Sequence, residues 1–193
     1  MDLLKKCALG FNILLKHQYR FVLGRKGQIK EFIISFDKSD FHHLAGLHKL
    51  KDNAKVQYGK RADIFDSILA GEITLEQIQK SEFYNEMKER LEPLCHLEAF
   101  LDNNDLIFHY NEKVNRYSVI KADYLLENIF YNQSVYLFLG ARARDKGEQM
   151  CRTFFLKQEK DYTIGQPKYT LLKKEKRNVE TGDIIVQYNR LGE

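Results

Sequence analysis

The spacing of the hydrophobic residues changes midway along this 193-residue chain, and that change limits the folds open to it. Up to about Asn103, apolar residues recur at intervals of three and four, which is the period of an amphipathic helix. Beyond Asn103, short aliphatic and aromatic runs alternate with turn-like polar segments, as strands do. Helices in one half and strands in the other predict an α+β fold, with helices packed on a largely antiparallel sheet.

The first half contains several predicted helices. The segment from Leu3 to Leu15 places its apolar residues on one face and its lysines on the other. A second helix, RADIFDSILA, is expected to end at Gly71, because glycine adopts the left-handed conformation that terminates helices. The segment 74–105 is expected to be helical in two or three pieces, with Thr74 and Gln77 as a capping box and Pro93 as a kink or restart.

A β-hairpin interrupts this helical half. Two β-rich runs, Tyr19–Leu23 and Ile29–Phe36, flank the sequence GRKG. Gly24 and Gly27 are expected to supply the permissive turn geometry. After the hairpin, Asp37, Ser39 or Asp40 is expected to cap the next helix.

Six strands are predicted after Asn103: LIFHYN, YSVIKADYLL, SVYLFLGARA, MCRTFFLKQ, KYTLLKKEKRN and DIIVQYN. We find no internal repeat and no linker in the sequence. We therefore expect a single α+β domain over residues 1–193, helix-rich from 1 to 103 and strand-rich from 104 to 193.

Composition favours a folded cytoplasmic protein. The chain is 44% hydrophobic, which is enough for a substantial core, and no apolar run approaches the roughly 18 residues of a membrane span. The N-terminal segment is broken by lysines and is not expected to be a signal peptide. Cys7, Cys95 and Cys151 are odd in number and far apart, so we expect reduced thiols, with neither a disulfide framework nor a structural zinc site.

Charge is unevenly distributed along the chain. Residues 1–62 carry 13 Lys and Arg against 5 Asp and Glu, and residues 63–139 carry 6 against 14. The remaining residues are again basic, and the formal net charge is +4. If the two basic ends meet in space, they form a positive surface suited to phosphate; otherwise these charges are ordinary solvated faces.

The segment DFHHLAGLHKL holds three of the six histidines. If it is one continuous helix, His43 and His48 lie at different points of an apolar stripe while His42 points away, so the three rings do not converge. Their spacings also differ from the i, i+4 pair of a zinc helix, and we predict no metal site. Buried packing and a functional role both stay open for His43 and His48.

The remaining chemistry is cationic and hydroxylic, because the sequence contains no P-loop, GxSxG, GxGxxG or HExxH motif. Arg142 and Arg144 are expected to project to one side of a strand end. Arg152 alternates with Met150 and Phe154, so it is expected on an apolar face, where it needs an acidic partner or an anionic ligand. Histidine, lysine, arginine and hydroxyl groups suffice to cleave RNA without a metal, because the 2′-OH of the substrate is the nucleophile.

The run from Tyr19 to Asp52, YRFVLGRKGQIKEFIISFDKSDFHHLAGLHKLKD, resembles the start of a nuclease family associated with phages and mobile elements. That family is assigned to the barnase–EndoU–colicin–RelE (BECR) fold and is the fourth phage-borne family of that naming. Its hallmark is a β-hairpin followed by a helix of the FHHLxGLxKL type, which this chain matches from Phe41 to Leu50. KRADIFDSIL and SVYLFL are also similar.

The resemblance implies a metal-independent endoribonuclease, in some relatives a toxin or effector, with RNA as partner, a possible cognate inhibitor protein and no cofactor. On this basis the predicted catalytic residues are His43, His48, Arg152 and Thr153. The predicted substrate-binding residues are Arg25, Lys26, His42, Lys49, Arg61, Arg142 and Arg144. Two alternatives stay open: a non-catalytic RNA- or protein-binding module, and a structural domain of a phage or mobile element.

Overall fold

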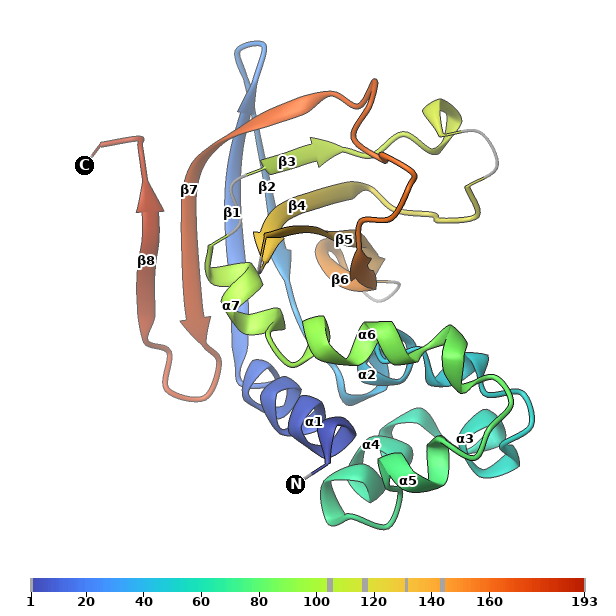
Figure 1. Cartoon of the computed structure of the whole chain (residues 1–193). Coiled ribbons are helices and arrows are strands. Elements are labelled where there is room, and N and C mark those ends of the chain that lie inside the picture. Colours follow the sequence, from blue (N-terminus) through green and yellow to red (C-terminus); the bar gives the residue numbers. More distant parts are fainter. Residues whose placement is uncertain (1, 104–105, 116–117, 131, 143–144, 193) are drawn as a thin grey trace.

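An eight-stranded sheet runs through the molecule, and the helices gather at one end of it (Figure 1). The computed structural model describes residues 2–103, 106–115, 118–130, 132–142 and 145–192. The α-helices are α1 (Leu3–Leu14), α2 (Lys38–Leu44), α3 (Ala54–Tyr58), α4 (Arg61–Ala70), α5 (Leu75–Ile78), α6 (Lys88–Leu94) and α7 (Leu97–Asp102). Short 3₁₀ helices are η1 (Leu47–Lys49), η2 (Tyr84–Glu86) and η3 (Glu112–Val114). The mixed α+β class predicted from the sequence is confirmed.

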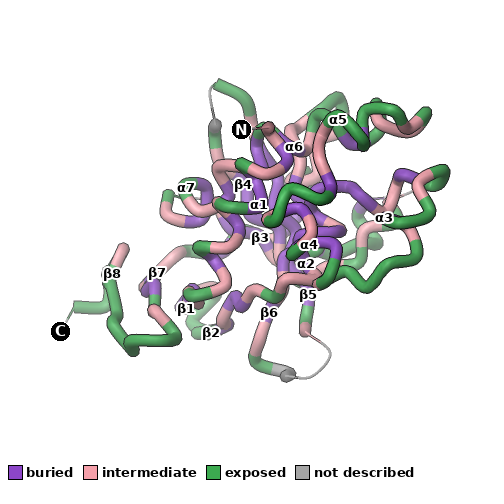
Figure 2. The backbone as a smooth tube through the Cα atoms, turned by 90° about the horizontal axis from the view of Figure 1, so that it is seen from below, coloured by how far each residue is buried: buried purple, intermediate pink, exposed green. Residues whose placement is uncertain are grey.

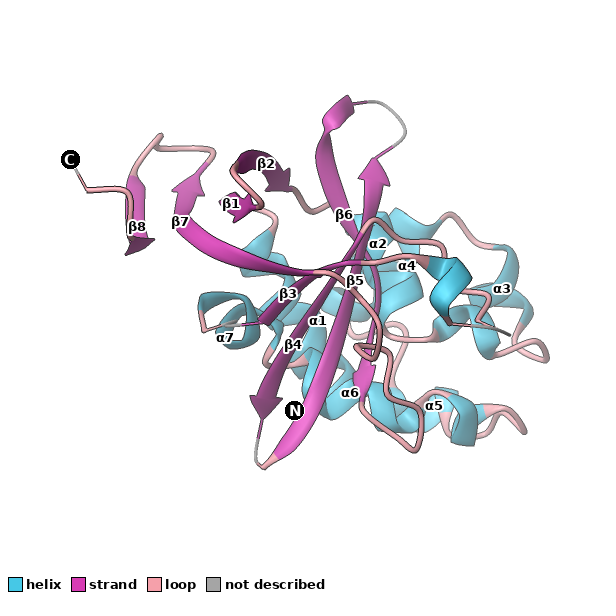
Figure 3. Ribbon diagram, turned by 90° about the horizontal axis from the view of Figure 1, so that it is seen from above, coloured by secondary structure: helices cyan, strands magenta, loops and turns pink. Residues whose placement is uncertain are grey.

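The strands are β1 (His17–Arg25), β2 (Gln28–Ile34), β3 (Leu106–His109), β4 (Tyr124–Phe130), β5 (Gln133–Arg142), β6 (Asp145–Leu156), β7 (Lys168–Asn178) and β8 (Ile184–Asn189). Their order is β1-β2-β6-β5-β4-β3-β7-β8, and β1 also pairs with β7, so the sheet closes on itself and β8 extends outward. All pairings are antiparallel except the short contact between β2 and β6. The top view in Figure 3 shows the strong twist that accompanies this closure.

The main core joins the helices of the first half to strands of both halves. Phe11 of α1, Phe41 of α2 and Phe65 of α4 form a triangle of rings with centroids 5.2–5.9 Å apart. All three side chains are buried, and aromatic pairs at this separation favour edge-to-face packing. Figure 2 shows that the buried segments lie at the centre of the molecule and that strand β8 is exposed at the periphery.

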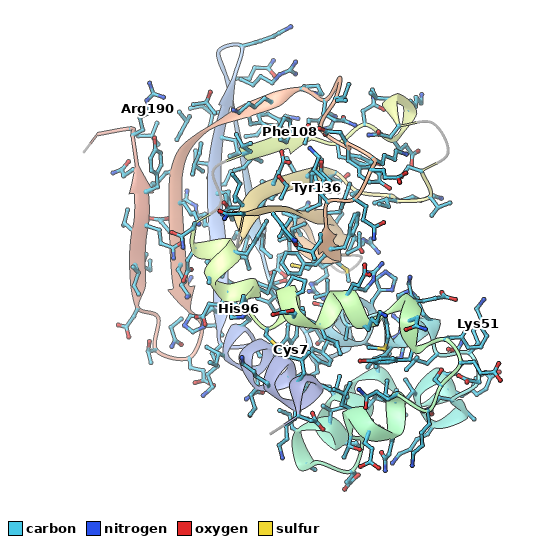
Figure 4. The ribbon with its side chains drawn as sticks, in the orientation of Figure 1. Cys7, Lys51, His96, Phe108, Tyr136 and Arg190 are labelled. Atoms are coloured by element: carbon cyan, nitrogen blue, oxygen red, sulfur yellow. A yellow bond between two sulfur atoms is a disulfide. The ribbon has the colours of Figure 1, made fainter. Side chains whose placement is uncertain are left out.

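A second, smaller apolar cluster lies on the β3–β4–β5 part of the sheet and contains Phe108, Tyr110, Leu125, Tyr136 and Phe138. Alternation along the strands explains it, because Leu137 joins the main core while its neighbours Tyr136 and Phe138 face the other side. Figure 4 labels Phe108 and Tyr136 within this cluster. Both faces of this part of the sheet are therefore apolar.

Several predicted boundaries are confirmed. The first helix, the capping box of Thr74 and Gln77, and the helix end at Gly71 are all present. Five of the six predicted strands coincide with β3, β5, β6, β7 and β8 within a few residues, apart from the longer N-terminal part of β6. The sixth, YSVIKADYLL, was placed too early in the sequence, because β4 runs from Tyr124 to Phe130.

The hairpin is confirmed, but of its two predicted turn glycines Gly27 lies in the turn and Gly24 does not. Lys26 and Gly27 hold positive φ angles of 49° and 76°, whereas Gly24 lies within β1, opposite Ile29. Gly24 instead leaves room for Leu172, which a Cβ would meet at 3.0 Å.

The cysteine prediction was wrong for one pair. Cys7 of α1 and Cys95, which follows α6, are joined by a disulfide, and Cys151 is a buried free thiol. Figure 4 shows Cys7 beneath the junction of α6 and α7, near His96. The residues are 88 positions apart, so only the packing of α1 against α6 brings them together. Sequence spacing carried no sign of this contact.

The continuous helix assumed for DFHHLAGLHKL was also wrong. Asp37 caps α2 and forms a capping box with Asp40, but the helix ends after Leu44. Gly46 then adopts the left-handed conformation, with φ of 77°, and η1 starts in a new direction. A Cβ at Gly46 would lie 2.9 Å from Met87 Cβ and 3.0 Å from Arg90 Cδ. The turn thus packs tightly against the start of α6. Only glycine suits both the left-handed backbone conformation and the short distance to Met87 and Arg90.

Substituting Gly46 therefore tests this close contact between the turn and α6. We expect Gly46→Ala to lower the free energy of unfolding by about 3 kcal/mol, because left-handed strain and overpacking add. Gly27→Ala is the matched control, since Gly27 has nearly the same φ and no atom within 4 Å of the added Cβ. We expect it to cost about 1 kcal/mol, from backbone strain alone. Urea unfolding of both variants measures the difference. Equal losses of unfolding free energy would show that the contact with α6 does not restrict residue 46.

Candidate active site

A cavity of about 690 Å³ opens where α2, η1, α6 and β6 meet. Figure 1 shows α6 and α2 directly below β6, at the boundary between the helices and the sheet. The cavity walls come from His43, His48 and Lys49 on one side, from Arg152, Thr153 and Phe155 of β6 on another, and from the segment around α6 on a third, namely Asn85, Glu86, Glu89 and Arg90. Residues 119–121 and Tyr162 complete the rim. The volume lies in the range of small-ligand sites.

His43 and His48 meet in this cavity. Their rings stack with centroids 4.2 Å apart and an angle of 17° between the planes. The left-handed turn at Gly46 reverses the chain between them, whereas a continuous helix would separate them. The sequence prediction that these rings do not converge was therefore wrong for this pair.

Both imidazoles favour the neutral form. Burial and the charge of Arg90 lower the pKa of His43, with smaller effects from Arg61 and Arg152. Burial lowers the pKa of His48 to about 3, helped by His43 and Arg90. The Nδ1 atom of His48 is buried and has no hydrogen-bond partner in the described part of the protein. Because two stacked imidazolium ions would repel each other, the pair holds at most one proton at ordinary pH.

Arg90 is the main cation of the site, and sequence analysis missed it. Its Nη1 donates a hydrogen bond to Thr153 Oγ1 at 3.0 Å, and its guanidinium lies 5.9 Å from the centre of the Phe155 ring. Burial lowers the pKa of Arg90, and we find no ion pair for it within the described ranges. Arg90 stands in the acidic middle of the chain, and no sequence motif pointed to it. A usable signal was present, because Met87, Leu91 and Leu94 define a buried helix stripe on which Arg90 also lies.

Lys49 and Thr153 fix the two sides of the cavity. Lys49 Nζ donates to the backbone carbonyl of Glu86 at 2.9 Å, which ties η1 to the segment before α6. Burial and the charge of Arg90 lower the pKa of Lys49. Thr153 is buried on β6 and orients Arg90 through its hydroxyl. Both residues were predicted site residues, and both line the cavity.

Arg152 reaches the cavity by a β-bulge. Phe138 pairs with Thr153 and Leu139 pairs with Cys151, so Arg152 is the unpaired extra residue of β6. A bulge turns its side chain out of the regular alternation, which explains why Arg152 is exposed and not on the apolar face expected from Met150 and Phe154. Its Nη2 donates to the carbonyl of Ala141 at 3.1 Å.

The other predicted substrate-binding residues that the structure describes do not line this cavity. Arg25 and Lys26 lie at the tip of the β1–β2 hairpin. His42 is buried and its Nε2 donates to the carbonyl of Val56 at 3.0 Å. Arg61 begins α4, near enough to lower the pKa of His43 but outside the wall.

Arg142 has a structural partner. Its Nη2 lies 2.7 Å from Oδ2 of the buried Asp40, and its Nε and Nη2 also donate to Ser35. These contacts connect the end of β5 to the start of α2. Arg144 lies outside the described residues.

The cavity also offers ring faces and carboxylates. Phe155 and Tyr162 are half-buried, with ring centroids 5.9 Å apart. Glu86 and Glu89 stand exposed at the rim. Among the described residues, no three His, Cys, Asp or Glu side chains form a group that could hold a metal ion. Nor is any described helix both long and apolar enough to cross a membrane.

The lowered histidine pKa values predict a pH dependence of stability. An unfolded histidine binds a proton below about pH 6.5, whereas folded His48 binds one only near pH 3. The unfolded state therefore holds more protons in this window, and acid destabilises the folded state. We expect the free energy of unfolding to fall between pH 7 and 4.5 by about 2 kcal/mol less in His48→Asn than in the unmodified chain. His17→Asn, which alters an imidazole outside the cavity, serves as the control, and identical slopes for both variants would contradict a neutral buried His48.

Comparison with known proteins places these features in a family. The model of one nuclease family matches residues 3–191, which is nearly the whole chain. Searches of curated proteins and of solved structures returned no match. The family name denotes a phage-associated nuclease of the BECR type and agrees with the resemblance inferred from the Tyr19–Asp52 segment. The chain therefore belongs to the family described as phage-Barnase-EndoU-ColicinE5/D-RelE like nuclease 4.

Proposed function

We propose that this chain is an endoribonuclease that cleaves RNA without a metal ion, by attack of the substrate 2′-OH on the adjacent phosphate. The observation that carries the proposal is the stacked pair of His43 and His48 in a cavity lined by Arg90 and Arg152. The family name supports nuclease activity, and the choice of RNA rests on the residues. Imidazoles and cations can supply acid–base catalysis and charge stabilisation, but the nucleophile must then come from the substrate, and only RNA has a 2′-OH.

The cations provide the site for the scissile phosphate. Arg90 has no carboxylate in ion-pair contact within the described residues, and its fork of N–H groups suits bidentate contact with phosphate oxygens. Arg152 and Lys49 approach the same space from other walls. A phosphate bound there compensates their mutual repulsion and stabilises the additional charge of the transition state.

The two imidazoles take different roles. His48, the ring with the more strongly suppressed charge, accepts the proton of the 2′-OH as the new 2′-O–P bond forms. His43 carries the single proton of the pair and delivers it to O5′ as the P–O5′ bond breaks. The products are a 2′,3′-cyclic phosphate and a 5′-OH end, and the proton then returns from His48 to His43. Thr153 acts through Arg90 as a positioning residue.

Cleavage of total RNA in EDTA tests this proposal. We expect the purified chain to cut RNA in the chelator, and His43→Ala and His48→Asn each to lower kcat by about 10²–10⁴-fold, the usual contribution of an acid or base. Arg90→Met should lower kcat by about 10²-fold or more, because a donor to the transition state is lost. Lys55→Ala on the exposed face of α3 is the control and should cleave normally.

Other outcomes separate the alternatives. Retarded RNA mobility without cleavage identifies a non-catalytic RNA-binding module, and indifference to RNA indicates an interaction domain. Cleavage that disappears in EDTA and returns with a divalent ion contradicts the proposed chemistry. Normal cleavage by both histidine variants contradicts the proposed site.

The role assignment also predicts the pH profile. The active form has His43 protonated and His48 neutral, and both pKa values lie below 6.5 in the free enzyme. The population of this form therefore rises as pH falls from 7, until His48 is protonated near pH 3. We expect the maximum of kcat/KM at an acidic pH at which circular dichroism still shows the folded chain. A maximum above pH 7 would reverse or exclude this assignment.

A further inference from the structure

A second cavity, of about 630 Å³, adjoins the first along the sheet. It lies beside the end of β3, η3 and the β5–β6 pair. Arg152 and Lys121 line both cavities and form the boundary between them. The two hollows are therefore parts of one groove that crosses β6.

The boundary is held in place by backbone contacts. Arg152 lies across Gly140, where an added Cβ would approach its Nε to 2.6 Å and its Cγ to 3.1 Å. Its Nη2 is fixed to the Ala141 carbonyl. Gly140 thus provides the space that keeps the Arg152 side chain flat against the sheet, with the groove open on either side.

The second cavity is suited to an anion. Lys113, Lys121 and Arg152 contribute three cations to its lining, and we find no ion pair for any of them in the part of the chain that is described. Of its two acids, Asp123 is occupied, because Oδ2 accepts the backbone N–H of Ala141 at 2.9 Å. Glu112 is exposed beside Lys113. The half-buried ring of His109 adds a further polar group.

The first cavity is suited to an unpaired base. Phe155 already stacks on Phe138 and has Arg90 over its ring, so Tyr162 is the half-buried ring of this cavity on which a base of single-stranded RNA can stack. A base paired within a duplex has no free face for this contact. The groove therefore combines a stacking surface at the proposed catalytic cavity with a separate group of cations beyond Arg152.

We infer that the second cavity is a subsite for the phosphate of a neighbouring nucleotide, and that the substrate class is single-stranded RNA bound along the whole groove. This inference rests on the proposed function and adds a second phosphate contact to it. Lys113 is the diagnostic residue, because it lines the second cavity but not the first.

The experiment measures the affinity of 2′-O-methyl oligouridines of different lengths, which cannot be cleaved because the 2′-oxygen is blocked. Isothermal titration with chains of two, four and six nucleotides is run on the unmodified protein, on Lys113→Glu, and on Lys55→Glu. The last variant makes the same change of net charge on exposed α3, away from the groove. Both lysines are exposed, so both variants should fold.

We expect affinity for the unmodified protein to rise from two to six nucleotides. Relative to Lys55→Glu, Lys113→Glu should bind the hexanucleotide about five- to tenfold more weakly while binding the dinucleotide equally. The slope of log K against log salt for the hexanucleotide should fall by about 0.7, the value for one lost phosphate contact on a single strand.

Equal hexanucleotide binding by the two variants, or affinity independent of length, would overturn the second subsite while leaving cleavage at the histidine pair intact. A duplex of the same length that binds as tightly as the single strand would overturn the substrate class. If the unmodified protein neither binds these chains nor cleaves RNA in EDTA, the proposed function fails and this inference fails with it.

Discussion

The left-handed turn at Gly46 is the constraint on which the candidate site depends. It ends α2 just after His42 and His43 and reverses the chain, so that His48 stacks on His43. The same glycine admits α6 to close contact, which places Arg90 near enough to both rings for its charge to lower their pKa values. A single residue without a side chain thus brings two imidazoles and a guanidinium together. The energetic cost of the turn is small for glycine and large for other residues.

Electrostatics explains why these groups are useful together. Arg90, Arg152 and Lys49 surround the cavity, and their charges together with burial keep the imidazoles largely neutral. An anion entering the cavity reverses this balance, because it stabilises the cations and the protonated form of a histidine at once. A phosphate bound in this cavity would therefore raise the proton affinity of the imidazoles. Perturbed pKa values of this kind occur in functional sites and in structural clusters. The stacked rings line an open cavity together with three cations, and this arrangement favours a functional site.

The sequence predicted the elements of the fold better than their junctions. Hydrophobic period and capping residues were sufficient for α1, α4 and the β1–β2 hairpin, because these features are local. They did not predict the break at Gly46, since an isolated glycine is tolerated within a helix and only the tertiary contact with α6 decides its conformation. The disulfide of Cys7 and Cys95 was not predicted for the same reason, because it depends on a tertiary contact between residues 88 positions apart.

The candidate site was predicted in part. His43, His48, Lys49, Arg152 and Thr153 were named from the sequence and do share one cavity. The bulge that turns Arg152 outward depends on how β6 pairs with β5, which alternation along one strand does not contain. Arg90 was not predicted, although it is a charged residue on the apolar helix stripe formed by Met87, Leu91 and Leu94. The idea that the two basic ends supply the cations was incomplete, because Arg90 and Lys121 come from the acidic middle of the chain.

The proposed mechanism depends on one chemical step, in which the 2′-oxygen of the substrate attacks a phosphate held beside the stacked rings of His43 and His48. Analysis of RNA ends after cleavage in EDTA by mass spectrometry tests it most directly. We expect 2′,3′-cyclic phosphate and 5′-OH ends, and no cut at a position carrying a single 2′-deoxy substitution. Ends with a 5′-phosphate and a 3′-OH, or cleavage at the deoxy position, would contradict it.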